Sequence, residues 1–223
     1  KHFNRRLLII NRESYMRNAE ETRLKKAHIT LMQHPMTSLY SGIIASGKNE
    51  VKDGEFTAYT DGINKVYSRK YVAEYDNEAK LRGLVLHENL HIGLRQMILN
   101  RDLFLENKKL ANVAADMVVN DIIVEIGKKD EKLVKLPEGG CYDPRFHNMN
   151  MREVYRILKD ECKNPKKPEG ENPRKGRGSG GGESQDSDGD GDGIGVGSPL
   201  IMLVPLSQIN FFPFLIHVNF LPP

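Results

Sequence analysis

Apolar residues recur with helical spacing along much of the chain. The spacing predicts four helices, over residues 11–34, 74–100, 110–127 and 149–158. The first of them is amphipathic, carries many charged residues and ends before Pro35. The second and third are apolar on nearly all sides, which is typical of helices inside a core. The pattern therefore predicts a mainly helical domain.

The segment between the first two helices predicts a small β structure. Phe56–Tyr59 and Ile63–Tyr67 are predicted strands, and Asp61–Gly62 between them is typical of a tight hairpin turn. The apolar run over residues 39–45 is too short for periodicity to separate strand from helix. The remaining polar stretches are predicted turns or loops, over residues 47–50, 52–54, 102–109 and 136–146. We therefore expect an α+β fold with a small sheet or hairpin before the second helix, and a sheet edge of this kind could hold an extended peptide.

The second predicted helix contains His87-Glu88-Asn89-Leu90-His91 within an apolar run. Residues four apart lie on one face of a helix, so His87 and His91 point the same way. Two neutral imidazoles at this spacing can bind one divalent ion, typically zinc, and Glu88 is near enough to act as a base without binding the ion. Two histidines and a carboxylate are costly to bury unless something binds them. The motif therefore predicts a catalytic zinc site, with Glu88 as the catalytic residue.

The third predicted helix supplies the candidate for a third ligand, which a catalytic zinc site requires. Asn112, Asp116 and Asn120 recur every four residues and form a polar stripe on an otherwise apolar helix. We expect Asp116 to bind the metal, and Asn112 and Asn120 to orient the ligands through hydrogen bonds. Asp121 is a competing ligand that lies off the stripe, and a purely structural role for Asp116 is a further alternative.

The turn-rich stretch after this helix carries other polar groups. Tyr142, Arg145 and His147 could enter a cleft and stabilise an oxyanion. A surface loop is the interpretation that we favour, because only closeness in sequence to the third helix supports a role in the site.

Charge and cysteine content bear on the class of partner and on the cellular compartment. The chain has 33 basic and 30 acidic side chains, so its charge balance gives no reason to expect a nucleic-acid partner. The two cysteines, Cys141 and Cys162, are too few for a disulfide scaffold and are not spaced as a zinc pair. We therefore expect a reducing, cytoplasmic location.

Composition divides the chain into three parts. Residues 1–163 are predicted to form one domain, and residues 164–193 a disordered linker of proline-bearing, glycine-rich and acidic segments. Residues 194–223 are apolar but interrupted by prolines, and no stretch among them reaches the roughly 20 residues that a membrane-spanning helix needs. We expect no membrane association, and a truncated or aberrant end is a hypothesis that explains this tail.

Four blocks of sequence together resemble a known family, the putative metallopeptidase domain of bacterial and phage proteins. The blocks are Thr57–Gly62, His87–His91, Asn112–Asp116 with Asn120, and Leu136–Gly139 running into Tyr142–Phe146. Their order and spacing match the family over about residues 30–160. The resemblance implies a zincin-like fold, a zinc site made by His87 and His91 with Glu88 as base, and a helix carrying Asp116 that faces the metal.

The chain also departs from this family. Many relatives carry another histidine four residues after the second ligand, where this chain has Arg95. A von Willebrand factor A-like domain often follows in relatives, but the tail lacks its Asp-x-Ser-x-Ser motif. Relatives also often sit beside a ring-forming ATPase, so the resemblance suggests such an ATPase as a partner.

These observations predict a zinc metallopeptidase that acts on a protein or peptide substrate. Zinc would activate water and polarise the scissile carbonyl, and Glu88 would take the water proton and pass it to the leaving amine. The alternative is a non-catalytic zinc-binding module that regulates or recruits a partner protein. A structural zinc site is closed by four protein ligands, whereas a catalytic one keeps an open position.

Overall fold

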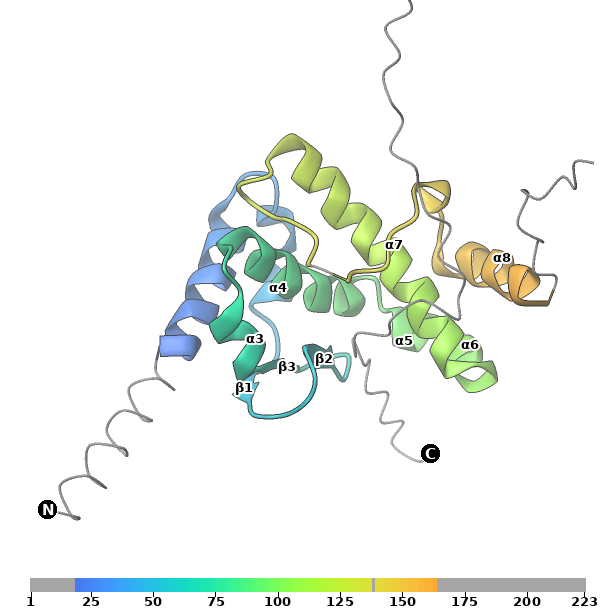
Figure 1. The fold of residues 1–223 in the computed structure, drawn as a ribbon, viewed down its shortest axis with the longest axis horizontal. Coiled ribbons are helices and arrows are strands. Elements are labelled where there is room, and N and C mark those ends of the chain that lie inside the picture. The colour runs from blue at the N-terminus through green and yellow to red at the C-terminus, as the bar shows by residue number, and fades with distance from the viewer. Residues whose placement is uncertain (1–18, 138, 164–223) are drawn as a thin grey trace, which may run out of the picture.

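A computed structural model describes residues 19–137 and 139–163 of the chain (Figure 1). Helices make up most of this part and a small sheet packs beside them, so the predicted α+β class is confirmed. Within these residues, none of the helices has the length and apolarity needed to span a lipid bilayer. The predictions for residues 1–18, the linker 164–193 and the tail 194–223 lie outside the described part.

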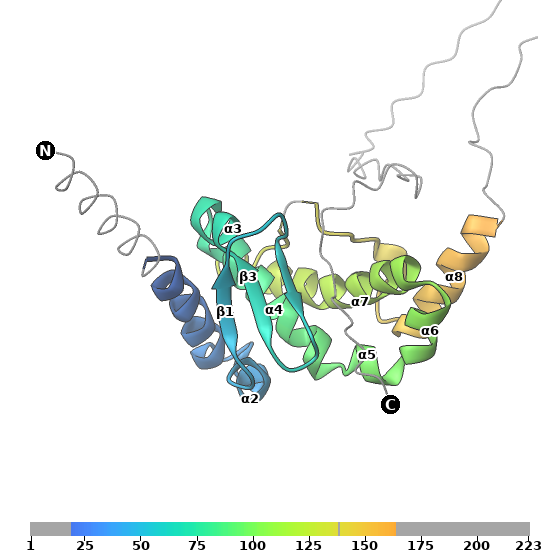
Figure 2. The ribbon, with the colours of Figure 1, turned by 90° about the horizontal axis from the view of Figure 1, so that it is seen from below.

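The first described helix covers residues 19–33, where the sequence predicts one. The elements that follow it are η1 (Ser38–Tyr40), α2 (Ser41–Ile44), β1 (Asn49–Lys52), β2 (Ala58–Thr60), β3 (Lys65–Ser68), α3 (Arg69–Glu74), α4 (Glu78–Gly93), α5 (Gln96–Leu99), α6 (Arg101–Glu106), α7 (Lys108–Lys129), η2 (Pro144–Phe146) and α8 (Met151–Lys163). Figures 1 and 2 show the first helix at one end of the molecule, α6 and α8 at the other, and α4 and α7 between them.

The sheet has the strand order β1-β3-β2 (Figure 2). β2 and β3 are antiparallel and joined by a turn in which Gly62 has a φ of 93°, so the predicted hairpin is confirmed. β1 pairs in parallel with β3, so the turns predicted over residues 47–50 and 52–54 are wrong at Asn49, Glu50 and Lys52. This strand is short and largely exposed, and its backbone pairing with the buried β3 creates it, without any hydrophobic alternation of its own.

The single helix predicted over residues 74–100 is interrupted. α4 ends at Gly93, and the chain turns at Arg95, whose φ of 49° lies in the left-handed region, before α5 begins. Gly93 lies so close to α2 that a Cβ built on it would be 2.7 Å from the Ile43 side chain. Apolar spacing continues through the break, so the pattern alone gives no sign of it.

The loop predicted over residues 102–109 is also wrong, because most of it is α6 and the start of α7. Leu103 and Phe104 of α6 are buried in the core beside α7. The Arg152 guanidinium of α8 donates two hydrogen bonds to the Asp102 carboxylate at 2.7 and 2.8 Å. Contacts with α7 and α8 therefore stabilise this short helix.

Two hydrophobic clusters form the core, and α7 contributes to both. One cluster joins α4, the sheet and the first helix to Val119 and Ile123 of α7. The other joins α6 and α8 to the N-terminal half of α7, including Ala115 and Met117. Asp116 lies on the stretch of α7 where one cluster gives way to the other, so a polar site there lies between two apolar packing regions.

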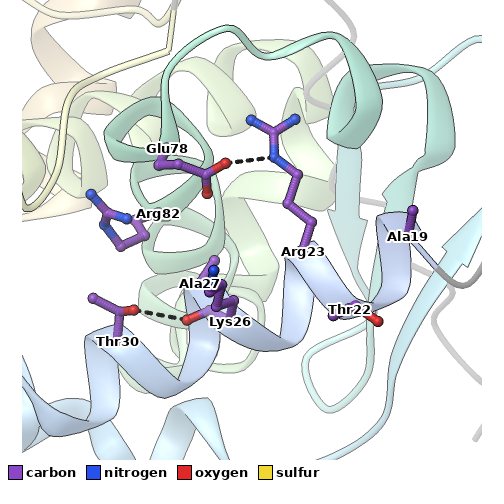
Figure 3. A pocket seen from close by; sticks show the side chains of 8 residues that line it. All are labelled: Ala19, Thr22, Arg23, Lys26, Ala27, Thr30, Glu78 and Arg82. Atoms are coloured by element: carbon purple, nitrogen blue, oxygen red, sulfur yellow. Dashed lines mark hydrogen bonds and ion pairs between the residues drawn. The ribbon is translucent and has the colours of Figure 1, made fainter.

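Two arginines connect distant segments around a hollow between the first helix and the start of α4 (Figure 3). Arg23 donates to the Glu78 carboxylate at 2.7 Å and to the Val72 carbonyl at 2.5 Å. Arg82 donates to the Leu133 carbonyl at 2.6 Å and so holds the segment after α7 against α4. Both guanidinium groups are therefore part of the scaffold that positions α4.

Candidate metal centre

α4 places two imidazoles next to each other in the interior. His87 and His91 are 2% and 1% exposed, and their ring centroids are 4.5 Å apart. Their Nε2 atoms face each other at 2.9 Å. This arrangement follows from the four-residue spacing of the pair on a regular helix.

α7 packs against α4 and brings a carboxylate to the same point. The Asp116 Oδ1 atom lies 3.5 Å from His87 Nε2 and 3.3 Å from His91 Nε2. The Asp116 carboxyl group therefore faces both rings.

The tautomer of His87 is determined by Asn120, one turn after Asp116 on α7. The Asn120 side-chain nitrogen donates to the Cys141 carbonyl at 2.8 Å, so its side-chain oxygen is the atom that faces the ring. That oxygen lies 2.8 Å from His87 Nδ1, which must carry a proton to form the hydrogen bond. The lone pair of neutral His87 is therefore on Nε2, on the side of Asp116.

Gln96 determines the tautomer of His91 in the same way. Its side-chain nitrogen donates to the Ala115 carbonyl at 3.2 Å, and its oxygen lies 2.6 Å from His91 Nδ1. This role of Gln96 could not be predicted from helical spacing. On a continuous helix, the residue five positions after His91 lies on a different face from the two histidines. The break at Arg95 turns Gln96 back towards the ring, and a polar residue before the apolar Met97, Ile98 and Leu99 is the one weak sign of it in the sequence.

When both imidazoles are neutral, three electron-pair donors therefore meet with no proton between them. The two Nε2 atoms and Asp116 Oδ1 are 2.9–3.5 Å apart, and Asp116 Oδ1 is buried without a hydrogen-bond donor. Atoms separated in this way can all lie about 2 Å from one ion, which is the length of zinc bonds to imidazole and carboxylate. The residues therefore fit a divalent cation, and His87, His91 and Asp116 form one potential metal-binding group.

Glu88 lies beside this group and is itself 2% exposed. Its Oε2 atom is buried without a hydrogen-bond partner. Burial raises the pKa of Glu88 to about 8; His91 opposes this rise and the Asp116 charge adds to it. A carboxyl group of this kind can exchange a proton near neutral pH.

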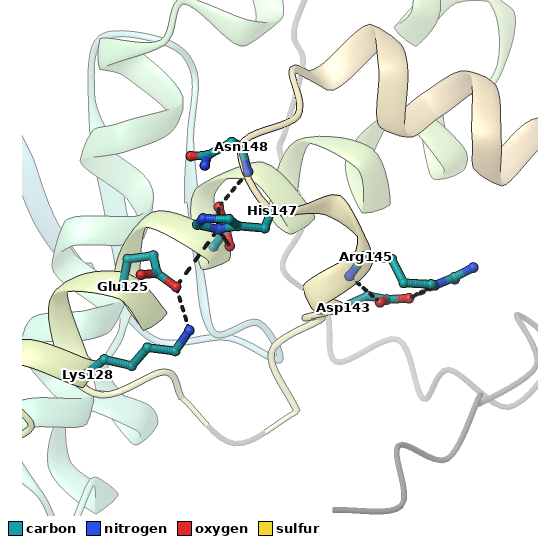
Figure 4. A network of polar contacts seen from close by, with 7 residues as sticks. Glu125, Lys128, Asp143, Arg145, His147 and Asn148 are labelled. Carbon is teal, nitrogen blue, oxygen red and sulfur yellow. Dashed lines mark hydrogen bonds and ion pairs between the residues drawn. The ribbon is translucent and has the colours of Figure 1, made fainter. Parts of the chain in front are cut away.

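Asp121, the competing ligand, belongs to a different polar cluster, whose members His147, Asn148 and Glu125 are labelled in Figure 4. Its carboxylate lies 3.0 Å from His147 Nδ1 and accepts from the Asn148 backbone N–H at 3.2 Å. Glu125 lies 3.9 Å from the same ring and binds the Lys128 ammonium at 2.5 Å. These contacts hold the loop with His147 against α7. Asp121, Glu125 and His147 also form a second potential metal-binding group, which is more exposed than the one around the two histidines of α4.

The other predicted residues have partners elsewhere or keep an untested role. The exposed Arg145 guanidinium binds the Asp143 carboxylate (Figure 4) and the Glu161 carboxylate, each at 2.7 Å. Tyr142 is half-buried in the same loop. Asn112 is half-buried one turn before Asp116, and its role in orienting a ligand stays a prediction.

Comparison with known proteins gives one match. A family model described as "Putative metallopeptidase domain" matches residues 19–198, which include the whole described part of the chain. No curated protein and no solved structure matches the chain.

Proposed function

We propose that this chain, which belongs to the putative metallopeptidase domain family, hydrolyses peptide bonds with a divalent ion bound by His87, His91 and Asp116. The observation that carries the proposal is the meeting of three donor atoms with defined lone pairs beside the buried carboxyl group of Glu88. Two imidazoles and one carboxylate are a ligand set of catalytic zinc, so zinc is the proposed ion. The proposed substrate is a protein or peptide.

Each residue has a distinct role in the proposed mechanism. When bound, zinc supplies Lewis-acid activation of water and of the scissile carbonyl. His87, His91 and Asp116 would hold the ion, and the amide oxygens that accept from each Nδ1–H would leave the Nε2 lone pair of the neutral imidazole for the metal. Glu88 takes a proton from the attacking water on its carboxylate and then gives it to the leaving amine nitrogen.

The number of converging ligands supports a hydrolase over a structural zinc module. A structural zinc site has four protein ligands, whereas a catalytic site has three and an open position. In residues 19–137 and 139–163, the group around the two histidines consists of His87, His91 and Asp116. The non-catalytic alternative, in which the domain serves a partner such as a ring-forming ATPase, would need a fourth ligand from elsewhere.

The sheet offers a place for an extended substrate in a zincin-like arrangement. β2 is an edge strand, pairs with β3 on one side and packs on α4, the helix with both histidines. An extended peptide that adds to β2 on the side away from β3 by backbone hydrogen bonds would run next to this helix. This pairing would recognise peptide backbone and would leave the side-chain preference open.

Zinc content and peptide cleavage test the proposal with three variants. Glu88→Gln should bind zinc like the wild type and lose cleavage of a peptide library, because the amide cannot accept the water proton. Asp116→Ala should reduce the zinc content measured by elemental analysis. Glu131→Gln makes the same change at an exposed glutamate and should alter neither quantity.

Two results would overturn parts of this proposal. Cleavage by Glu88→Gln at the wild-type rate would remove Glu88 from the mechanism. A wild-type protein that binds zinc fully but cleaves no library peptide would favour the non-catalytic module.

A further inference from the structure

Gln96 connects the three helices that make up the candidate centre. It is the first residue of α5, it is 2% exposed, and neither end of its amide group faces solvent. Its oxygen lies 2.6 Å from His91 Nδ1 on α4, and its nitrogen donates to the Ala115 carbonyl on α7 at 3.2 Å. Ala115 immediately precedes Asp116, so one side chain contacts both helices that carry the proposed ligands.

We propose that Gln96 is a positioning residue that presents the His91 Nε2 lone pair to the metal ion. The inference rests on the proposed function only in taking His91 as a metal ligand. By accepting from Nδ1–H, the Gln96 oxygen selects one tautomer and one ring orientation. By donating to the Ala115 carbonyl, the Gln96 nitrogen prevents the amide from presenting its N–H group to the ring instead.

The break after α4 places Gln96 beside His91. Arg95 adopts a left-handed conformation although it is not glycine, and this conformation starts a new helix at Gln96. On an uninterrupted helix a residue five positions after His91 would point away from the ring. The strained turn therefore brings the amide back to the histidine that it orients.

His87 is held by Asn120 in the same way as His91 is held by Gln96, and this supports a positioning role for Gln96. Asn120 accepts from His87 Nδ1 and donates to the Cys141 carbonyl, both at 2.8 Å. Each histidine is thus oriented by a buried amide whose second hydrogen bond to a backbone carbonyl determines its direction. A purely structural role for Gln96 would not require its oxygen to face a ring nitrogen.

Two substitutions separate the positioning role from packing. Gln96→Met keeps the approximate shape and removes both hydrogen bonds, so Zn²⁺ affinity should fall by about 10- to 100-fold. Gln96→Glu keeps an oxygen acceptor for His91 but loses the donor to the Ala115 carbonyl. We expect it to retain Zn²⁺ affinity within about threefold of the wild type, because a carboxylate orients a histidine at least as well as an amide. The same variant should show a lower urea midpoint.

The affinities are measured by competition with a chromophoric chelator, using Zn²⁺ alone and the full chain. Gln33→Met is the matched control, because Gln33 is exposed on the first described helix and the chemical change is the same. It should leave the affinity unchanged. If Gln96 had only a structural role, both Gln96 variants would lose Zn²⁺ affinity, and the less stable variant would lose more.

NMR gives a test that depends neither on a bound metal nor on a stable Gln96 variant. Long-range ¹H–¹⁵N spectra of the metal-free wild type at pH 8 should show His91 as the Nδ1–H tautomer, assigned with His91→Gln. Gln96→Met should convert this signal to a mixture of tautomers.

Two results would refute the inference. The first is an Nε2–H tautomer of His91 in the wild type, and the second is equal Zn²⁺ affinity of Gln96→Met and the wild type. No peptide is cleaved in either measurement, so a failure of the proposed hydrolase would leave this result unaffected, and the reverse also holds.

Discussion

Gly83 provides the sharpest test of how the scaffold holds the centre. It lies inside α4, four residues before His87, where glycine is usually unfavourable, and replacing a helical glycine with alanine typically stabilises a protein by about 0.5–1 kcal/mol. Here the segment after α7 approaches the helix closely. A Cβ built on Gly83 would lie 2.0 Å from the Lys135 backbone oxygen and 3.5 Å from Pro137 Cδ. We therefore predict that Gly83→Ala reverses the usual sign and destabilises the protein.

The expected loss follows from the contacts that must change. Helix and segment would have to separate by about 1 Å, and an overpacked core of this kind costs about 1–3 kcal/mol. The displacement would also break the hydrogen bond from the Lys135 N–H to the Ala79 carbonyl, now 3.0 Å long, at a cost of about 1 kcal/mol. After subtraction of the helix-propensity gain, the free energy of unfolding should fall by roughly 1–3.5 kcal/mol.

Urea unfolding followed by far-ultraviolet circular dichroism measures this change. Gly42→Ala is the matched control, because Gly42 is also helical and nothing lies within 4 Å of the Cβ that would be added. It should raise the free energy of unfolding by up to about 1 kcal/mol. If Gly83→Ala proves as stable as the wild type, the close approach between α4 and the segment carrying Lys135 does not exist.

Three further predictions concern the turn and the centre itself. Arg95→Gly should raise the free energy of unfolding by roughly 0.5–1 kcal/mol in urea titrations, since glycine adopts the left-handed φ of 49° without strain; Arg95→Ala, which keeps the strain, should give no gain. Asn120→Ala should weaken Zn²⁺ binding by about 10- to 100-fold in chelator competition, because His87 would lose the acceptor for its Nδ1–H, and wild-type affinity in this variant would contradict that role. Zn²⁺ at 100 times its dissociation constant should stabilise the fold by about 2.7 kcal/mol, read as a higher urea midpoint that EDTA reverses, and Asp116→Ala should show no comparable gain at the same Zn²⁺ concentration.

Helical spacing explains why several features could be read from the sequence. His87 and His91 are four apart in an apolar run, and a regular helix places such residues side by side wherever it lies in a fold. The stripe of Asn112, Asp116 and Asn120 follows the same rule, so two polar faces could be named before any contact between them was known. The hairpin over β2 and β3 depends on a local turn at Asp61–Gly62 and was equally visible.

Features that depend on distant contacts were missed or misjudged. α6 is helical because Leu103 and Phe104 are buried beside α7, and β1 is a strand because β3 supplies its hydrogen-bonding partner. The break at Arg95 does not interrupt the apolar spacing, so the alignment of Gln96 with His91 left no periodic signal. Each of these elements has a local sequence that permits more than one conformation, and packing selects among them.

The sequence by itself determined which chemical groups share a helix face, because that depends only on residue spacing and backbone geometry. The tertiary structure alone decided that the faces of α4 and α7 meet, with Asp116 rather than Asp121 beside the two imidazoles. It also decided the hydrogen-bond partner of each Nδ1 atom. Contacts of a few ångströms between side chains on different helices result from the packing of many side chains at once. Residue spacing along the chain does not determine them.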